Sequence, residues 1–139
     1  TTPNEGGLLG PALDPAFPTN GWFYLYYPPF SPSVNRLSRF TITGDTLQPG
    51  SEIILLQVPT QRDECCHSAR GLRFGPDGLL FLSTGDNTNP FASDGYSPID
   101  ERPGRAAWDA QKSSSNRNDL RGKILRIRPQ SDGTYTIPA

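Results

Sequence analysis

The sequence contains no methionine, a single histidine and only two cysteines in 139 residues. Two cysteines do not provide the spacing of a cysteine-based metal site. No apolar run approaches the roughly 20 residues that cross a bilayer, so we expect no membrane span. The net charge is −1, from 13 basic and 14 acidic residues. Because these charges nearly balance, the protein has no strong positive electrostatic field to attract nucleic acid, and we expect no nucleic-acid partner.

The two ends of the chain bear on its completeness. It opens with Thr1-Thr2-Pro3 and shows no signal peptide, and it stops directly after an expected strand. We interpret it as an excerpt of a longer polypeptide. A complete mature secreted domain is the alternative.

Turn-forming residues dominate what is present. Glycine and proline make up 29 of the 139 residues, and hydrophobic residues only 34%. This composition argues against long helices and favours short strands with many loops. Eight apolar or alternating runs, each closed by a turn signal, fit strands by length and by their β-branched and aromatic content. These runs are residues 7–13, 22–27, 36–43, 52–58, 71–74, 79–84, 123–128 and 134–137.

The expected strands fall into two groups of four that echo each other. Each group begins with an apolar strand, a turn containing proline and a second apolar strand. A repeating four-stranded unit is typical of a β-propeller blade, with residues 1–60 as a first blade and 61–139 as a second. An all-β sandwich of two four-stranded sheets has the same strand count, so both architectures remain open at this point.

Residues 87–121 interrupt the strand pattern. The segment is rich in Asn, Ser, Asp and Pro and has no sustained period. A long loop without structure of its own is usually functional or disordered. Phe91, Tyr96 and Trp108 within it favour a packed loop, and residues 106–112 are expected to form one or two helical turns.

His67 is the best candidate for proton transfer near neutral pH. If residues 71–74 and 79–84 form a hairpin, the start of the first strand lies beside the end of the second. His67 and Asp86 then lie at the same end of the sheet, where the carboxylate could orient the imidazole. A loop histidine bonded to nearby backbone is the alternative.

Two further groups could carry chemistry. Cys65 and Cys66 are adjacent, and they are either two free thiols or a strained eight-membered disulfide ring, which an exported protein would favour. Several acidic and amide residues could offer oxygens to Ca²⁺ or could instead cap the backbone of their own loop. These residues are Asp86, Asn87, Asn89, Asp94, Asp100 and Glu101.

Five motifs occur in one order along the chain: residues 5–10 (Glu-Gly-Gly-Leu-Leu-Gly), His67-Ser68, residues 74–78 (Phe-Gly-Pro-Asp-Gly), residues 83–86 (Ser-Thr-Gly-Asp) and residues 121–126 (Arg-Gly-Lys-Ile-Leu-Arg). Together they resemble the glucose/sorbosone dehydrogenase family, whose enzymes depend on pyrroloquinoline quinone (PQQ). Residues 86–105, with the two cysteines ahead of the histidine, resemble a secreted bacterial branch. The resemblance implies a six-bladed β-propeller, of which this chain is about two blades.

The resemblance also implies roles for residues. His67 matches the family's catalytic base, which takes the proton of a sugar's anomeric hydroxyl as hydride passes to the quinone, and Asp86 matches the aspartate that positions it. Glu5 occupies a position where the family commonly has a glutamine that contacts PQQ, and a carboxylate there would repel the anionic quinone unless protonated or turned away. Arg70 could pair with a PQQ carboxylate or face solvent.

The implied protein is a secreted or periplasmic sugar dehydrogenase with an external electron acceptor. Its calcium site and further PQQ-binding arginines are expected outside this chain, so the excerpt alone is expected to be inactive and to hold no metal ligands. Two alternatives remain: a Ca²⁺-dependent sugar lactonase on the same architecture, and a propeller that has lost catalysis and serves as a binding module.

Overall fold

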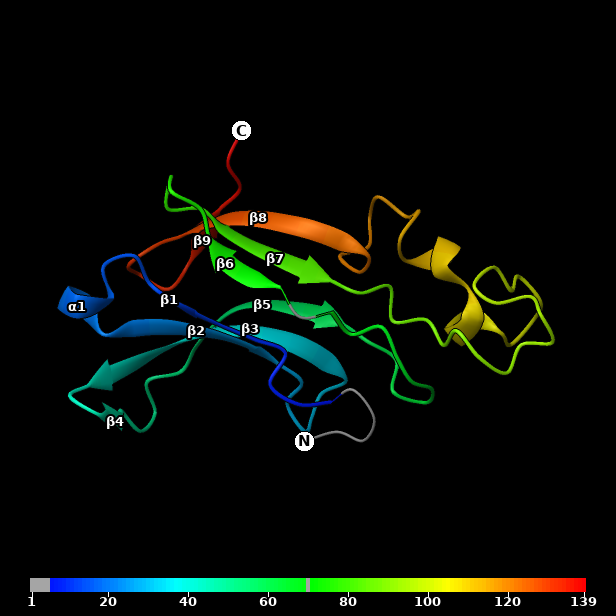
Figure 1. The fold of residues 1–139 in the computed structure, drawn as a ribbon, viewed down its shortest axis with the longest axis horizontal. Helices are drawn as coiled ribbons and strands as arrows, with labels where there is room; N and C mark the ends of the chain where they lie inside the picture. Colours follow the sequence, from blue (N-terminus) through cyan, green and yellow to red (C-terminus); the bar gives the residue numbers. More distant parts are fainter. Residues whose placement is uncertain (1–5, 70) are drawn as a thin grey trace.

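Two antiparallel sheets face each other in the computed structural model, which describes residues 6–69 and 71–139 (Figure 1). The first sheet has the order β1-β2-β3-β5, and a short β4 pairs with the far end of β3. The second has the order β6-β7-β8-β9. The strands of the first sheet are β1 (Gly10–Leu13), β2 (Trp22–Tyr27), β3 (Val34–Thr43), β4 (Thr46–Leu47) and β5 (Ile53–Pro59). Those of the second are β6 (Leu72–Phe74), β7 (Leu80–Thr84), β8 (Lys123–Pro129) and β9 (Tyr135–Thr136).

All eight expected strands are present, and the all-β class is confirmed. The expected count of four in the first group was wrong by one, because β3 runs on past the sheet and turns back through Gly44 into β4. A single helical turn, α1 (Phe17–Asn20), was also missed. Four residues are too few to show a helical period. None of the helices in the described ranges is long and apolar enough to cross a membrane.

The core lies between the two sheets. Leu37 of β3, and Leu80 and Leu82 of β7, are almost completely buried, and they belong to one apolar cluster drawn from both sheets. The ring of Tyr24 meets the edge of the Phe74 ring across the interface, with centroids 5.2 Å apart. Edge-to-face packing of this kind stabilises aromatic pairs beyond the area they bury. The two sheets therefore form one packed unit rather than two independent ones.

A buried arginine also ties the sheets together. Arg39 of β3 is 3% exposed and donates to the carbonyls of Gln130 and Ser131, at 2.9 and 3.1 Å. Its guanidinium lies 3.9 Å from the centroid of the Trp22 ring. The planar guanidinium of arginine can bridge the sheets in this way because it donates to two carbonyls at once and still stacks on an aromatic face.

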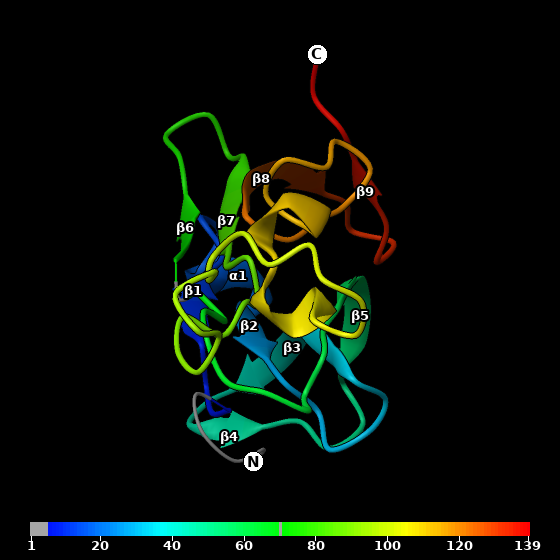
Figure 2. The same ribbon diagram turned by 90° about the vertical axis from the view of Figure 1, so that its right-hand side faces the viewer.

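The long loop covers one end of the sheets. It leaves β7 at Gly85 and returns to β8, and it contains two single turns, η1 (Ala106–Trp108) and η2 (Ala110–Lys112). Figure 1 shows it beyond the ends of β7 and β8, and Figure 2 views the molecule from this end. The expected helical turns at residues 106–112 are thus confirmed. The turn of Gly44 lies at the opposite end of the first sheet (Figure 1).

Candidate active site

His67 and Asp86 meet at the end of the second sheet, as the hairpin geometry predicted. His67 Nδ1 lies 2.9 Å from Asp86 Oδ1. The register of β6 against β7, which pairs Leu72 with Leu82, brings the segment before β6 beside the segment after β7. The His67 side chain is 44% exposed and that of Asp86 22%. The pair is therefore open to a small molecule.

The hydrogen bond fixes which nitrogen of His67 is free. An ionised carboxylate can only accept, so His67 Nδ1 carries the proton and Nε2 is left as a proton acceptor. Asp86 Oδ1 also accepts from the backbone N–H of Thr88 at 2.9 Å. This hydrogen bond to the backbone two residues on is an Asx turn, and it holds the carboxylate in place independently of the imidazole. Asp86 can therefore orient the ring of His67.

The backbone around His67 leaves little freedom. His67, Ala69 and Asn87 all have positive φ angles, of 54°, 68° and 56°. Such angles are uncommon outside glycine and often mark functional segments. The His67 carbonyl accepts from the Asn87 N–H at 3.2 Å. A Cβ at Gly85 would overlap that same carbonyl and lie 3.1 Å from Ala69 N. Glycine is thus required where the strand end passes the histidine segment.

A reciprocal set of hydrogen bonds fastens the segment ahead of His67. Asn87, which is 7% exposed, accepts from the Gln61 N–H at 2.6 Å and donates to the Gln61 carbonyl at 3.2 Å. Gln61 Nε2 donates to the Asn87 carbonyl at 3.1 Å. Asn89 Nδ2 donates to Glu64 Oε2 at 2.7 Å. Because residues 61–64 are held in this way to residues 87–89, both sides of His67 are attached to the end of β7.

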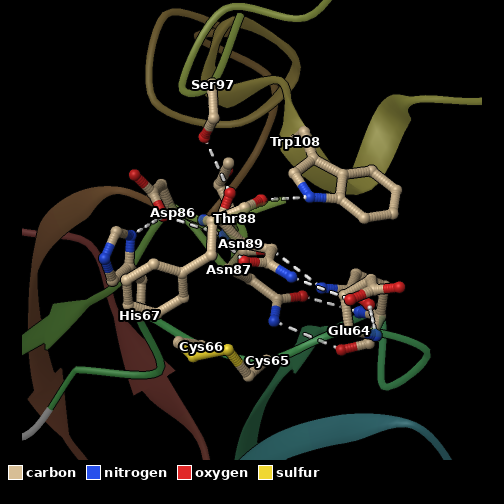
Figure 3. The surroundings of a disulfide bond; sticks show 12 residues. Glu64, Cys65, Cys66, His67, Asp86, Asn87, Thr88, Asn89, Ser97 and Trp108 are labelled. Atoms are coloured by element: carbon tan, nitrogen blue, oxygen red, sulfur yellow. Dashed lines mark hydrogen bonds and ion pairs between the residues drawn. A yellow bond between two sulfur atoms is a disulfide. The ribbon is translucent and has the colours of Figure 1, made fainter. Parts of the chain in front are cut away.

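Cys65 and Cys66 form a disulfide immediately before His67. Of the two sequence-based alternatives, the structure has the eight-membered ring, and the described residues contain no free cysteine. Both cysteines are half-buried. Figure 3 shows the disulfide between Glu64 and His67, beside the Asp86–Asn89 segment. The disulfide ring therefore lies between residues 61–64, which are bonded to residues 87–89, and His67, whose carbonyl accepts from the Asn87 N–H.

Several of the oxygens considered for Ca²⁺ are already engaged by groups of the protein. Asp100 is fully buried and pairs with Arg102 at 2.8 Å and Arg105 at 3.3 Å. It also accepts from the Ser93 hydroxyl. The Arg102 hydrogen bonds hold the pKa of Asp100 well below its usual range. Asn89 Oδ1 accepts from its own loop backbone at 2.8 Å. Within residues 6–69 and 71–139, no group of three or more His, Cys, Asp or Glu side chains could hold a metal ion.

The aromatic residues of the long loop are less packed than expected, because Phe91 and Tyr96 are 66% and 54% exposed. The Trp108 ring carries the Arg105 guanidinium 3.8 Å from its centroid, and Trp108 Nε1 donates to the Phe91 carbonyl at 2.7 Å. The Tyr96 ring carries Arg102 at 4.1 Å. The two predicted cofactor contacts, Glu5 and Arg70, lie outside the described residues.

The family model for glucose/sorbosone dehydrogenase matches residues 1–137. The chain belongs to this family. An uncharacterized protein of Synechocystis sp. is 31% identical over 137 residues, which cover 97% of this chain and 29% of that protein. The chain therefore spans less than a third of the length of that protein.

Solved structures agree with the family assignment. The PQQ-bound form of an aldose sugar dehydrogenase from Streptomyces coelicolor superposes with a TM-score of 0.66 at 27% identity, covering 93% of this chain and 32% of that one. An oxidoreductase described as a glucose dehydrogenase, from Thermus thermophilus, gives 0.64 at 25% identity, covering 90% and 32%. The likeness decides between the two open architectures: the sheets match blades of a β-propeller, not a sandwich.

Two features of this candidate site differ in whether the sequence carries a recognisable signal for them. The interlock of Gln61 with Asn87 joins positions 26 apart, and no local pattern marks it. The close approach of Gly85 to the His67 segment does have a signal, because a glycine at the end of a strand often marks a place where another backbone passes close by.

Proposed function

We propose that the full-length protein carrying this chain is a PQQ-dependent sugar dehydrogenase, with His67 as the general base. The observation that carries the proposal is the 2.9 Å bond between His67 Nδ1 and Asp86 Oδ1 at the exposed end of the second sheet. Membership of the glucose/sorbosone dehydrogenase family and the likeness to a PQQ-bound aldose sugar dehydrogenase support it. Residues 1–60 and 61–139 are consecutive blades in this proposal.

The chemistry of this chain is proton transfer. Nε2 of His67 accepts the proton of the sugar's anomeric hydroxyl as the C–H bond at the same carbon breaks. Asp86 keeps the Nδ1 proton in place and stabilises the imidazolium that forms. PQQ, when bound, supplies the acceptor for the hydride. An external electron acceptor then reoxidises the enzyme.

The residues present fit PQQ in part. PQQ is planar and carries carboxylates, and the half-buried Cys65–Cys66 disulfide offers it an uncharged surface next to the base. Arg70, three positions after His67, is the cation of this chain proposed to pair with a PQQ carboxylate. Glu5 would approach PQQ only as the protonated acid. We propose that the remaining cations and the Ca²⁺ ligands lie elsewhere in the full-length protein.

The disulfide also bears on location. Disulfides persist in oxidising compartments and are rare in the cytosol. A protein with a bonded Cys65–Cys66 pair is therefore proposed to be secreted or periplasmic.

The test is PQQ titration of the full-length protein, with reduction of a redox dye by aldoses as the readout. His67→Ala should lower turnover by about 10²–10⁴, as is typical for loss of a general base, while PQQ still binds. Asp86→Asn should lower turnover and shift its pH profile. Unchanged turnover in His67→Ala would refute the assignment. Ca²⁺-dependent lactone hydrolysis without quinone would instead support a lactonase, and neither activity a binding module.

Asp132→Asn is the matched control for Asp86→Asn. Asp132 Oδ1 accepts from the backbone N–H two residues on, at 2.9 Å, just as Asp86 Oδ1 does. No histidine is bonded to it among the described residues, and it lies in the turn between β8 and β9. Asp132→Asn therefore removes the same charge from the same kind of turn without touching the base.

A further inference from the structure

Asn87 directly follows Asp86, and each of its four polar groups bonds to the segment that carries the base. Its side-chain oxygen accepts from the Gln61 N–H at 2.6 Å, and its side-chain nitrogen donates to the Gln61 carbonyl at 3.2 Å. Its backbone carbonyl accepts from Gln61 Nε2 at 3.1 Å, and its backbone N–H donates to the His67 carbonyl at 3.2 Å. One residue thus holds residues 61–67 at both ends.

Packing does not hold this segment from behind. Asp86, the partner of His67 Nδ1, lines a cavity of about 310 Å³ together with Gln61, Asn87 and Trp108, whereas His67 does not line it. The cavity therefore lies on the Nδ1 side of the ring, behind the base. Side chains beside a cavity have no packed protein atoms on that side. Hydrogen bonds must therefore set the distance between the base segment and Asp86.

Asparagine suits this position for two reasons. Asn87 has a φ of 56°, in the left-handed region where asparagine is enriched several-fold among residues other than glycine. Its amide both donates and accepts, whereas a carboxylate only accepts. The residue is 7% exposed, and in Figure 3 its side chain points toward Glu64 and away from His67. Its bonds therefore serve the loop and not the reacting groups.

Building on the proposed function, we propose that Asn87 is a positioning residue of the base. By fixing both ends of residues 61–67, it keeps His67 Nδ1 within reach of Asp86 Oδ1 and leaves Nε2 free to accept the proton of the substrate. Without the side-chain bonds the segment moves back into the cavity and the His67–Asp86 bond lengthens. The ring then takes up the other tautomer, in which Nε2 carries the proton and cannot act as a base.

The test is Asn87→Gly in the full-length protein loaded with PQQ. Glycine accepts the positive φ and keeps both backbone bonds, so only the two side-chain bonds are lost. The kcat of dye-coupled sugar oxidation should fall by about 10- to 100-fold, since a displacement of about 1 Å can cost 10²-fold. The affinity for PQQ should stay unchanged. Gln61→Met, which leaves the bonds of the Asn87 side chain intact and removes the one from Gln61 Nε2, should lower kcat by a smaller factor.

Asn20→Gly is the matched control. Asn20 Oδ1 accepts from the Trp22 N–H and Nδ2 donates to Asp14 Oδ1, both at 2.9 Å. The residue ends α1, at the opposite end of the sheets from the long loop (Figure 1). Asn20→Gly therefore removes an accepted and a donated bond of the same kind, and it should lower the melting temperature without lowering kcat.

A double-mutant cycle separates positioning from general destabilisation. Asp86→Asn removes the partner that Asn87 keeps within reach of His67. Adding Asn87→Gly to Asp86→Asn should therefore lower kcat by about twofold at most, because residues that act as one unit are not additive. The full loss of kcat in both backgrounds would show destabilisation alone and would overturn the proposal.

The tautomer of His67 gives a readout that needs no sugar oxidation. In protein made with isotopically labelled histidine, the nitrogen chemical shifts distinguish the two neutral tautomers, and His67→Ala assigns the signal. Wild type and Asn20→Gly should show the proton on Nδ1, and Asn87→Gly should move it toward Nε2. That move in a protein that oxidises no sugar would support the positioning role and refute the proposed function. Sugar oxidation with kcat and tautomer unchanged in Asn87→Gly would refute the positioning role alone.

Discussion

Replacing Gly85 by alanine should displace the base without touching it. The new Cβ would overlap the His67 carbonyl and approach Ala69 N at 3.1 Å, and both neighbours are backbone atoms that no side-chain rotation can move. Ordinary contacts of a Cβ lie at 3.4–4 Å. The His67 segment must therefore retreat by about 1 Å or more, and a misplacement of about 1 Å can cost 10²-fold in rate. Overpacking of this kind also costs about 1–3 kcal/mol of stability.

Gly44→Ala is the control that separates displacement from instability. Gly44 has a φ of 60° and open space around its Cβ position, at the opposite end of the first sheet. A non-glycine residue in that conformation costs about 1–2 kcal/mol. Both variants should therefore melt at a lower temperature, but only Gly85→Ala should lose about 10²-fold in dye-coupled kcat. Equal kcat in the two variants would refute the close approach of Gly85 to the histidine segment.

Two further predictions concern the loops. Arg102 holds the pKa of Asp100 below its usual range, so this carboxylate stabilises the fold above the unfolded value near pH 4, and the effect is lost as the pH falls below it. Asp100→Asn should lower the melting temperature at pH 7, with the gap to the wild type closing toward about pH 2; a gap independent of pH would contradict this. Thiol titration in denaturant without reductant should find no free thiol at Cys65 or Cys66, and peptide mapping should place the bridge within one chain. Reduction should weaken PQQ binding, whereas affinity indifferent to reductant would leave the disulfide without a role at the site.

The strands could be predicted from the sequence because turn-forming residues mark where each of them ends. Residues 79–84 are apolar and end at Gly85, and residues 123–128 alternate cleanly and are followed by Pro129. Both strands form where expected. The pairing of His67 with Asp86 followed from the same logic, because a tight hairpin fixes its own register. Turn residues close in sequence therefore sufficed to predict which strands pair, and the position of the candidate base depends only on such a hairpin.

What the sequence could not reveal depends on segments that meet only after folding. The cavity of Trp108 and Asp86 joins the strand end to a loop without a period, and no spacing rule brings those positions together. Arg39 reads as an ordinary strand cation, yet it is buried. Buried arginines are rare unless paired, and its partners are main-chain carbonyls that carry no mark in the sequence.

That arginine has a consequence for how the chain acquires its structure. The bond from Arg39 to the Gln130 carbonyl spans 91 positions, and contacts of such separation form late because the intervening chain must first be ordered. The guanidinium becomes a fixed donor only once β2 and β3 have paired and Trp22 lies beside it. The turn between β8 and β9 should accordingly be the last part to gain protection from hydrogen exchange during refolding.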